Sequence, residues 1–227
     1  MKKLLLGNEA IARGVYEAGV RVSSAYPGTP STEINETIAT YPEIYSEWAP
    51  NEKVAVEVAL GAAVSGARSF ACMKHVGLNV AADPYYTASY TGVNAGMVIV
   101  VADDPGMHSS QDEQDTRMIA KSAHTPCIEP SNSQECKDFI KAAYEISEEY
   151  DTPVIVRITT RVAHARTLVE IGERDELPLR EYKRDIKKFV SMPANMIGRH
   201  VYVEERERKL TEAASGLSIN RIEWADK

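Results

Sequence analysis

Two carboxylates in the stretch APNEKVAVEVALGAAVSGARS, residues 49–69, are the first candidates for chemistry. Glu52 stands at the start of a predicted helix over 52–66, and Glu57 follows five residues later within a run of small residues. Five residues turn a helix about 140° beyond a full turn, so the two carboxylates do not share a face. The helix dipole favours an acidic residue at this end, which gives Glu52 a purely structural interpretation. The alternative is that Glu52 faces something that is not protein.

The stretch AYPGTPSTEI, residues 25–34, follows a predicted strand and can be interpreted in two ways. Thr29 can cap the next helix, Pro30 suits its first turn, and Gly28 lets the backbone approach a neighbour. Ordinary capping explains all three residues. In the functional interpretation, Thr29 and the helix start present hydrogen-bond donors to an anion.

Two further polar stretches follow predicted strands. KHVGLN, residues 74–79, brings a cation, the imidazole of His75, the glycine Gly77 and the amide of Asn79 within six residues. DDPGMHSSQDEQDTR, residues 103–117, contains five carboxylates and a histidine. A single histidine is usually structural and a loop this polar is usually solvated. Long loops at strand ends are nevertheless frequent binding sites.

The elements that must position these residues alternate between strand and helix. Continuous β-branched runs such as GMVIVVA and TPVIVRITT predict strands buried on both faces, which is typical of a parallel sheet. The sequence therefore predicts a three-layer αβα fold with a mainly parallel sheet, and ligands on such sheets bind beyond the carboxyl ends of the strands. Predicted strands cover 20–25, 68–73, 96–102 and 152–160, with another in MKKLLLGNEA at the chain start; predicted helices cover 8–19, 30–40, 52–66, 79–90, 116–123 and 133–150.

Composition sets limits on domains and partners. Of the 227 residues, 44% are hydrophobic and 26% charged, as in globular proteins. We expect one domain over 1–167 and a charged linker with a docking helix over 168–227, where β-branched residues become scarce. The net charge of -7 argues against nucleic acid or an anionic membrane as a partner. No apolar run reaches the ~18 residues of a membrane span.

The three cysteines, Cys72, Cys127 and Cys136, lack the CxxC spacing and indicate a reducing, cytoplasmic compartment. They are too few for an iron–sulfur cluster held by this chain alone. No histidine and cysteine cluster suggests a metal site, and neither a complete phosphate loop nor a GxGxxG motif follows a strand, which disfavours a nucleotide-binding protein.

Four motifs, taken in order, carry a resemblance to a known family. YPGTPSTEI, NEKVAVEVALGAAVSGARS, MKHVGLNVAADP and VIVVADDPGMHSSQDEQDTR span residues 26–117. They resemble the amino-terminal pyrimidine-binding domain of thiamine-diphosphate enzymes, and among these the alpha subunits of indolepyruvate:ferredoxin oxidoreductases. The resemblance implies oxidative decarboxylation of an aryl pyruvate to an acyl-CoA, with CoA as cosubstrate and ferredoxin as electron acceptor.

The resemblance also implies roles for individual residues. Glu52, which lies nine residues before Gly61, takes the place of the catalytic glutamate that hydrogen-bonds the cofactor's pyrimidine ring. Gly28, Thr29, His75, Gly77 and Asn79 would line the cofactor cavity, with Thr29 and His75 also facing the substrate. Glu57 does not fit the family spacing, and we expect it at a packing edge.

This sequence differs from the family because two motifs expected in such enzymes are not found in it. The GDG…N motif that binds diphosphate and magnesium is not found here, nor are the ferredoxin-like cysteines of the clusters. We therefore expect a fragment or one piece of a split enzyme, partnered by a diphosphate-binding domain and a second subunit. The alternative is a non-catalytic assembly module of the same fold. The alanines of the 55–67 helix further suggest a homodimer through this helix.

Overall fold

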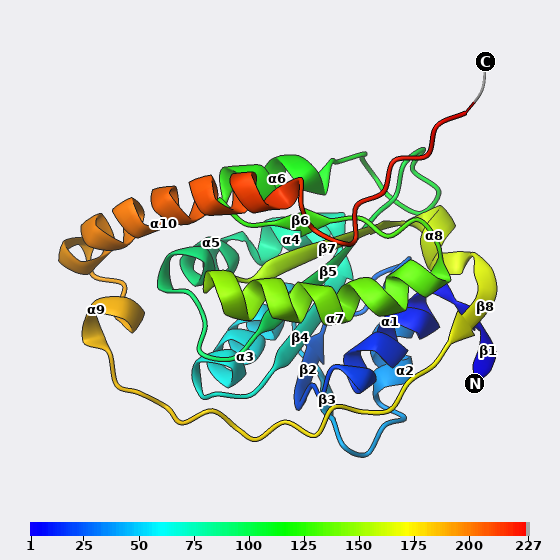
Figure 1. Ribbon diagram of the computed structural model, residues 1–227, viewed down its shortest axis with the longest axis horizontal. Coiled ribbons are helices and arrows are strands. Elements are labelled where there is room, and N and C mark those ends of the chain that lie inside the picture. The colour runs from blue at the N-terminus through cyan, green and yellow to red at the C-terminus, as the bar shows by residue number, and fades with distance from the viewer. Residues whose placement is uncertain (226–227) are drawn as a thin grey trace.

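A six-stranded sheet forms the centre of the computed structural model, which describes residues 1–225 (Figure 1). Its strand order is β3-β2-β4-β5-β7-β6, and every neighbouring pair is parallel. The parallel sheet predicted from the sequence is thus confirmed. The strands are β2 (Val22–Ala25), β3 (Tyr45–Trp48), β4 (Ser69–Lys74), β5 (Met97–Asp103), β6 (Cys127–Ile128) and β7 (Val154–Thr159).

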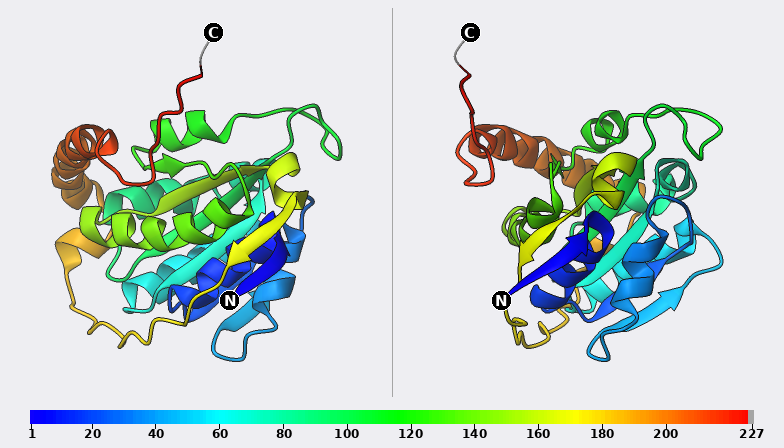
Figure 2. Two further views of the ribbon diagram at one scale, coloured as in Figure 1. Left: turned by 45° about the vertical axis from the view of Figure 1, so that its right-hand side comes forward. Right: turned by 90° about the vertical axis from the view of Figure 1, so that its right-hand side faces the viewer.

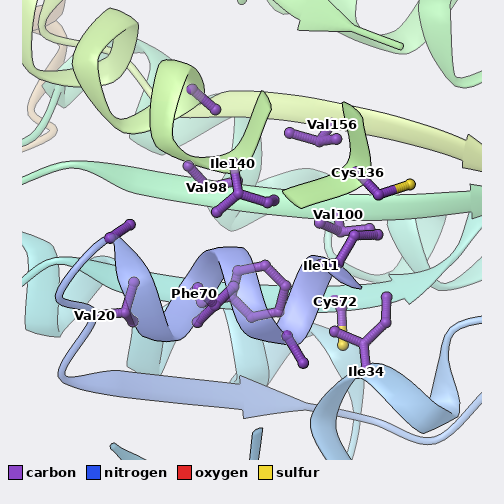
Figure 3. Close-up of a cluster of buried hydrophobic side chains, with 14 of the residues drawn as sticks. Ile11, Val20, Ile34, Phe70, Cys72, Val98, Val100, Cys136, Ile140 and Val156 are labelled. Carbon is purple, nitrogen blue, oxygen red and sulfur yellow. The ribbon is translucent and has the colours of Figure 1, made fainter. Parts of the chain in front are cut away.

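Helices cover both faces of the sheet, as the two further views show (Figure 2). One layer is formed by α1 (Gly7–Glu17), α2 (Thr32–Ile38) and α7 (Ser133–Tyr150), and the other by α3 (Glu52–Val64), α4 (His75–Val80), α5 (Ala82–Thr91) and α6 (Thr116–Ser122). Val98 and Val100 of β5 pack against the first layer (Figure 3), whereas Ile99 packs against the second. Burial on both faces explains why β5 is apolar at consecutive positions.

The chain start forms a strand, as expected, but outside the main sheet. β1 (Lys2–Leu6) pairs antiparallel with β8 (Arg166–Glu170) in a separate two-stranded sheet. The short helix α8 (Thr160–His164) connects β7 to this pair. The sequence analysis missed β8, together with the short strands β3 and β6.

Several predicted helix boundaries need correction. The helix expected over 30–40 begins only at Thr32 because residues 28–31 form a turn in which the Ser31 amide donates to the Gly28 carbonyl. Thr29 is therefore not the cap of α2. The helix expected over 79–90 is mainly α5, which begins at Ala82, whereas the stretch 75–79, expected in a loop, belongs to the separate helix α4. The helix expected over 8–19 is α1, which ends before Gly19, and the φ of 70° at Gly19 is typical of a glycine that follows a helix.

The alanine face proposed for dimerisation is mostly core. Ala55, Ala59 and Ala63 are fully buried, so a bulky residue at these positions would disrupt the packing of α3 on the sheet. The exposed face of α3 carries Glu57 and Gly61 instead. The expectation that Glu57 lies away from Glu52, near a packing edge, agrees with its exposure.

Residues 171–185, named here the C-terminal strap, run without helix or strand and hydrogen-bond to the domain. Arg174 donates to the carbonyls of Tyr16 and Val20, and the Arg180 amide donates to the Gly66 carbonyl. The strap leads into α9 (Ile186–Phe189) and α10 (Pro193–Ala214), which lies beside α5 (Figure 1). The expected C-terminal helix is present. No helix among residues 1–225 is long and apolar enough to cross a membrane.

Candidate functional site

Loops that follow β2, β4 and β5 meet at the carboxyl edge of the sheet. These three strands are neighbours in the order β2-β4-β5, so their ends lie side by side. The loop after β2 contains Gly28 and Thr29, the corner after β4 leads directly into α4, and the loop after β5 covers residues 104–115. The fold thus brings together the three stretches that the sequence singled out.

Glu52 lies against Gly77, the third residue of α4. Asn51 caps α3 by accepting a hydrogen bond from the Val54 amide, which fixes Glu52 as the first helical residue. A Cβ atom added to Gly77 would come within 2.5 Å of Glu52 Oε1, so only glycine leaves this space for the carboxylate. Glu52 is half-buried, and none of residues 1–225 donates a hydrogen bond to its carboxylate.

His75 is fully buried at the start of α4 and has one unsatisfied nitrogen. Its Nε2 lies 3.3 Å from the Asp112 carbonyl and 3.5 Å from Asp112 Oδ1. Its Nδ1 is buried without a hydrogen-bond partner in the part of the chain that the structure describes. A buried polar atom without a partner is unfavourable, so Nδ1 is an unsatisfied polar group at this edge of the sheet.

Asn79 and Thr29 differ in whether their side chains already have a hydrogen-bond partner in the protein. The exposed Asn79 amide donates to Gln114 Oε1 at 3.0 Å and so contacts the loop after β5. Thr29 is exposed at the tip of the loop after β2, and its neighbour Gly28 packs on Lys74, where an added Cβ would lie 3.3 Å from the Lys74 Cβ. Thr29 is therefore available to a ligand, whereas Asn79 already has a protein partner.

Two buried aspartates fix the ends of the acidic loop. Asp103 forms an ion pair with Arg157 at 2.6 Å and accepts from Thr116 at the far end of the loop. Asp104 accepts from Ser109, Ser110 and Thr160. Burial opposes ionisation of Asp104, but these donors outweigh it and hold the pKa of its carboxyl well below the usual range. Hydrogen bonds and an ion pair thus hold this loop in a defined conformation.

Asn8 is a residue of this region that the sequence analysis missed. It is fully buried at the start of α1, and its Nδ2 donates to the Pro30 carbonyl at 2.7 Å and to Glu33 at 2.9 Å. Through these contacts Asn8 holds the loop that contains Thr29 in place. No local motif marks Asn8, because its partners lie more than twenty residues away in the chain.

A cavity of about 350 Å³ lies between β6, α7 and α10, and none of the residues named above as site candidates lines it. The three thiols are free, with Cys72 and Cys136 fully buried and Cys127 half-buried. Burial raises the pKa of each to about 12, so none is a reactive thiolate near neutral pH.

Comparisons with known proteins show the family to which the chain belongs. Residues 13–213 match the family model described as "Pyruvate flavodoxin/ferredoxin oxidoreductase, thiamine diP-bdg". The chain is 50% identical over 222 residues to indolepyruvate oxidoreductase subunit IorA of Methanothermobacter marburgensis, which covers 96% of this chain and 36% of that protein. It is 31% identical over 177 residues to 2-oxoglutarate synthase subunit KorA of Methanothermobacter thermautotrophicus, covering 74% of this chain and 47% of that one.

A solved structure shares the fold. The 2-oxoglutarate:ferredoxin oxidoreductase from Magnetococcus marinus, solved with 2-oxoglutarate, coenzyme A and succinyl-CoA bound, superposes with a TM-score of 0.75 at 18% identity, over 93% of this chain and 45% of that one. The chain spans about a third of the length of the curated IorA proteins it matches (36%). Because the family model covers most of the chain, the chain belongs to the thiamine-diphosphate-binding family of pyruvate flavodoxin/ferredoxin oxidoreductases.

Proposed function

We propose that this chain is the pyrimidine-binding part of a thiamine-diphosphate-dependent oxidoreductase that transfers electrons from indolepyruvate or another aryl pyruvate to ferredoxin. The observation that carries the proposal is Glu52, a half-buried carboxylate without a protein donor, in a space that only glycine at position 77 leaves open. The identity of 50% to an IorA subunit supports an aryl pyruvate as the substrate.

The residues at the edge of the sheet fit an aminopyrimidine ring. Glu52 provides an acceptor at the start of α3, and the buried Nδ1 of His75 lacks a partner within residues 1–225. Gly28, Thr29, Gly77 and Asn79 complete the surface around them. When bound, thiamine diphosphate supplies the carbanion chemistry, and the protein supplies orientation and proton control. The part of Glu52 is to hold a proton at its carboxylate and share it with a ring nitrogen.

The remaining components of the enzyme belong to the same proposal. Diphosphate and magnesium would be held by a separate domain, and iron–sulfur clusters in the rest of the enzyme would carry electrons to ferredoxin after transfer of the acyl group to CoA. A second subunit completes the assembly. The three free thiols are consistent with a reducing cytoplasmic compartment. A homodimer would have to use a surface other than the buried alanines of α3.

The complete enzyme, assembled with its partner subunit, tests the substrate assignment. Ferredoxin reduction should depend on CoA, and indolepyruvate should be used with a higher kcat/KM than pyruvate or 2-oxoglutarate. Absence of turnover with every 2-oxo acid would favour a non-catalytic assembly module instead.

The isolated chain should not bind the cofactor tightly. The diphosphate and its metal make the strongest, charge-assisted contacts in such sites, and the residues at this edge offer mainly a surface for the pyrimidine ring. Calorimetric titration of residues 1–227 with thiamine diphosphate and magnesium should therefore give a Kd weaker than about 100 μM. An affinity in the low micromolar range would mean that the chain holds the diphosphate itself.

Gly77→Ala should weaken activity through Glu52. The new methyl group would lie within 2.5 Å of Glu52 Oε1, so the carboxylate must move. Because this atom ends a flexible side chain, we expect a small change in Tm and a fall in kcat of about tenfold, below the ~100-fold of a full 1 Å misplacement. Gly61→Ala is the control, since an added Cβ there meets no atom within 4 Å. Equal activity of the Gly77 and Gly61 variants would contradict the contact.

A further inference from the structure

Lys74 occupies the point where the three edge loops meet. It is the last residue of β4, next to the buried His75, and its Cβ packs against Gly28 of the loop after β2. Its Nζ donates to the Ser109 carbonyl of the loop after β5 at 2.6 Å. The side chain is half-buried, so its ammonium group lies between two loops at the rim of the candidate site.

Although the loop beside it contains five carboxylates, Lys74 forms no ion pair with any of them. Each carboxylate has another partner. Asp103 pairs with Arg157, Asp104 accepts from Ser109, Ser110 and Thr160, Asp112 lies against His75 and Gln114, Glu113 accepts from the Gly106 amide, and Asp115 pairs with Arg117. The loop is acidic in sequence, but its charges are directed elsewhere.

The result is an ammonium group with a single neutral acceptor among the described residues. An ammonium has three donors, so two remain for a ligand. The contact with Ser109 is exposed to solvent, so these donors are open to an incoming anion, with which an ammonium forms a charge-assisted hydrogen bond. The exposed Thr29 follows Gly28 directly in the chain, so the loop that packs on Lys74 also carries a hydroxyl donor.

We infer that Lys74 binds the carboxylate of the 2-oxo acid, next to the Thr29 hydroxyl, and so selects an anionic substrate. The inference rests on the proposed function, because it assigns a substrate contact within that site. It gives Lys74 a binding role that is separate from the proton role of Glu52. Loss of the Lys74 charge should therefore raise KM for the 2-oxo acid more than it lowers kcat.

The test uses the complete enzyme with three variants. Lys74→Gln keeps a donor for the Ser109 carbonyl but removes the charge, and Lys74→Arg keeps the charge. Lys121→Gln is a matched control for loss of a lysine, because Lys121 is exposed on α6 and lines the cavity beside α10. For Lys74→Gln we expect KM for the 2-oxo acid to rise about 10- to 100-fold, as for loss of one charge-assisted contact, with KM for CoA unchanged. Lys74→Arg should recover part of the loss, and Lys121→Gln should match the wild type.

The binding of two unreactive probes tests the role of Lys74 independently of whether the enzyme turns over an aryl pyruvate. Indole-3-acetate carries a carboxylate, and indole-3-acetamide is its neutral counterpart. The wild type should bind the acetate more tightly than the amide, and Lys74→Gln should lose this preference with unchanged amide affinity. Equal weakening for both probes would show that Lys74 only supports the loop, and an unaltered preference would show that its charge is not used. The affinities for the two probes can be measured even if the wild type turns over no aryl pyruvate. Such a lack of turnover would overturn the proposed function but not the binding role of Lys74.

Discussion

A complete enzyme carrying Glu52→Gln should turn over about 10²- to 10⁴-fold more slowly than the wild type, the range lost when a positioned general acid–base group is removed. Glutamine has nearly the same shape and still accepts a hydrogen bond, but it cannot hold the shared proton. Because Glu52 is half-buried and receives no hydrogen bond from the rest of residues 1–225, the substitution should leave Tm almost unchanged. Single-turnover measurement of ferredoxin reduction, with Tm from calorimetry, checks both statements.

Glu57→Gln is the matched control for this change. It removes the same charge from the same helix, but Glu57 is exposed on the opposite side of α3. Its activity should stay within about twofold of the wild type, as is usual for surface changes of at most 0.5 kcal/mol. Similar losses in both variants would reject Glu52 as the specific proton-handling group and suggest an effect on the whole helix.

Arg206→Met should lower the free energy of unfolding by about 3 kcal/mol, the largest stability effect that we expect from α10. Arg206 is only 3% exposed, and its guanidinium donates to the Ser89 and Asp151 carbonyls, the Ser89 hydroxyl and the His124 carbonyl. Burial lowers the pKa of Arg206 to about 10, with Asp151 opposing the shift, so the group remains charged at neutral pH. Methionine would fill the space but leave these acceptors without their donor.

Urea unfolding of the two variants Arg206→Met and Arg208→Met makes the comparison direct. Arg208 lies two residues further along α10 and is exposed, so its loss should change stability by no more than about 0.5 kcal/mol. A single cooperative transition shifted to lower urea in Arg206→Met would show that α10 is part of the folding unit. Unchanged stability would instead support a loosely docked helix, as the predicted boundary at residue 167 implies.

The sequence was most informative where local signals and burial coincide. The helix predicted over 133–150 has those bounds in the structure, because Asn132 caps its start and Asp151 ends it in the left-handed conformation. The run GMVIVVA is β5, since only a strand covered on both faces needs apolar residues at consecutive positions. The stretches that begin near Gly28, His75 and Asp103 were placed at one edge of the sheet by the rule for parallel strands, and the strand order β2-β4-β5 brings them together there. Glu52 follows β3, which was not predicted, so the strand rule did not place it.

What the sequence could not show depends on contacts between distant residues. β3 is a half-polar edge strand of four residues, YSEW, which has no apolar run to reveal it. β1 pairs with a strand more than 150 residues away, and no local pattern records such a pairing. Within residues 1–225, the lack of an ion pair at Lys74 and the deep burial of Arg206 follow only from how the partners around them are distributed.

The separation between the edge loops and the doubly covered sheet bears on how this domain can evolve. Thr29 and Met107 are exposed on the loops, and Asn79 is exposed on α4, whereas the core is formed by strand and helix residues such as those of β5. Mutations at the loop tips therefore leave the buried packing intact. Substitutions there can accumulate without lowering the stability of the domain below the threshold needed for function. Gly77 and Glu52 are the exception, because each restricts what the other can become. If the proposed function holds, sequence changes should alter which 2-oxo acid is accepted long before they alter the cofactor.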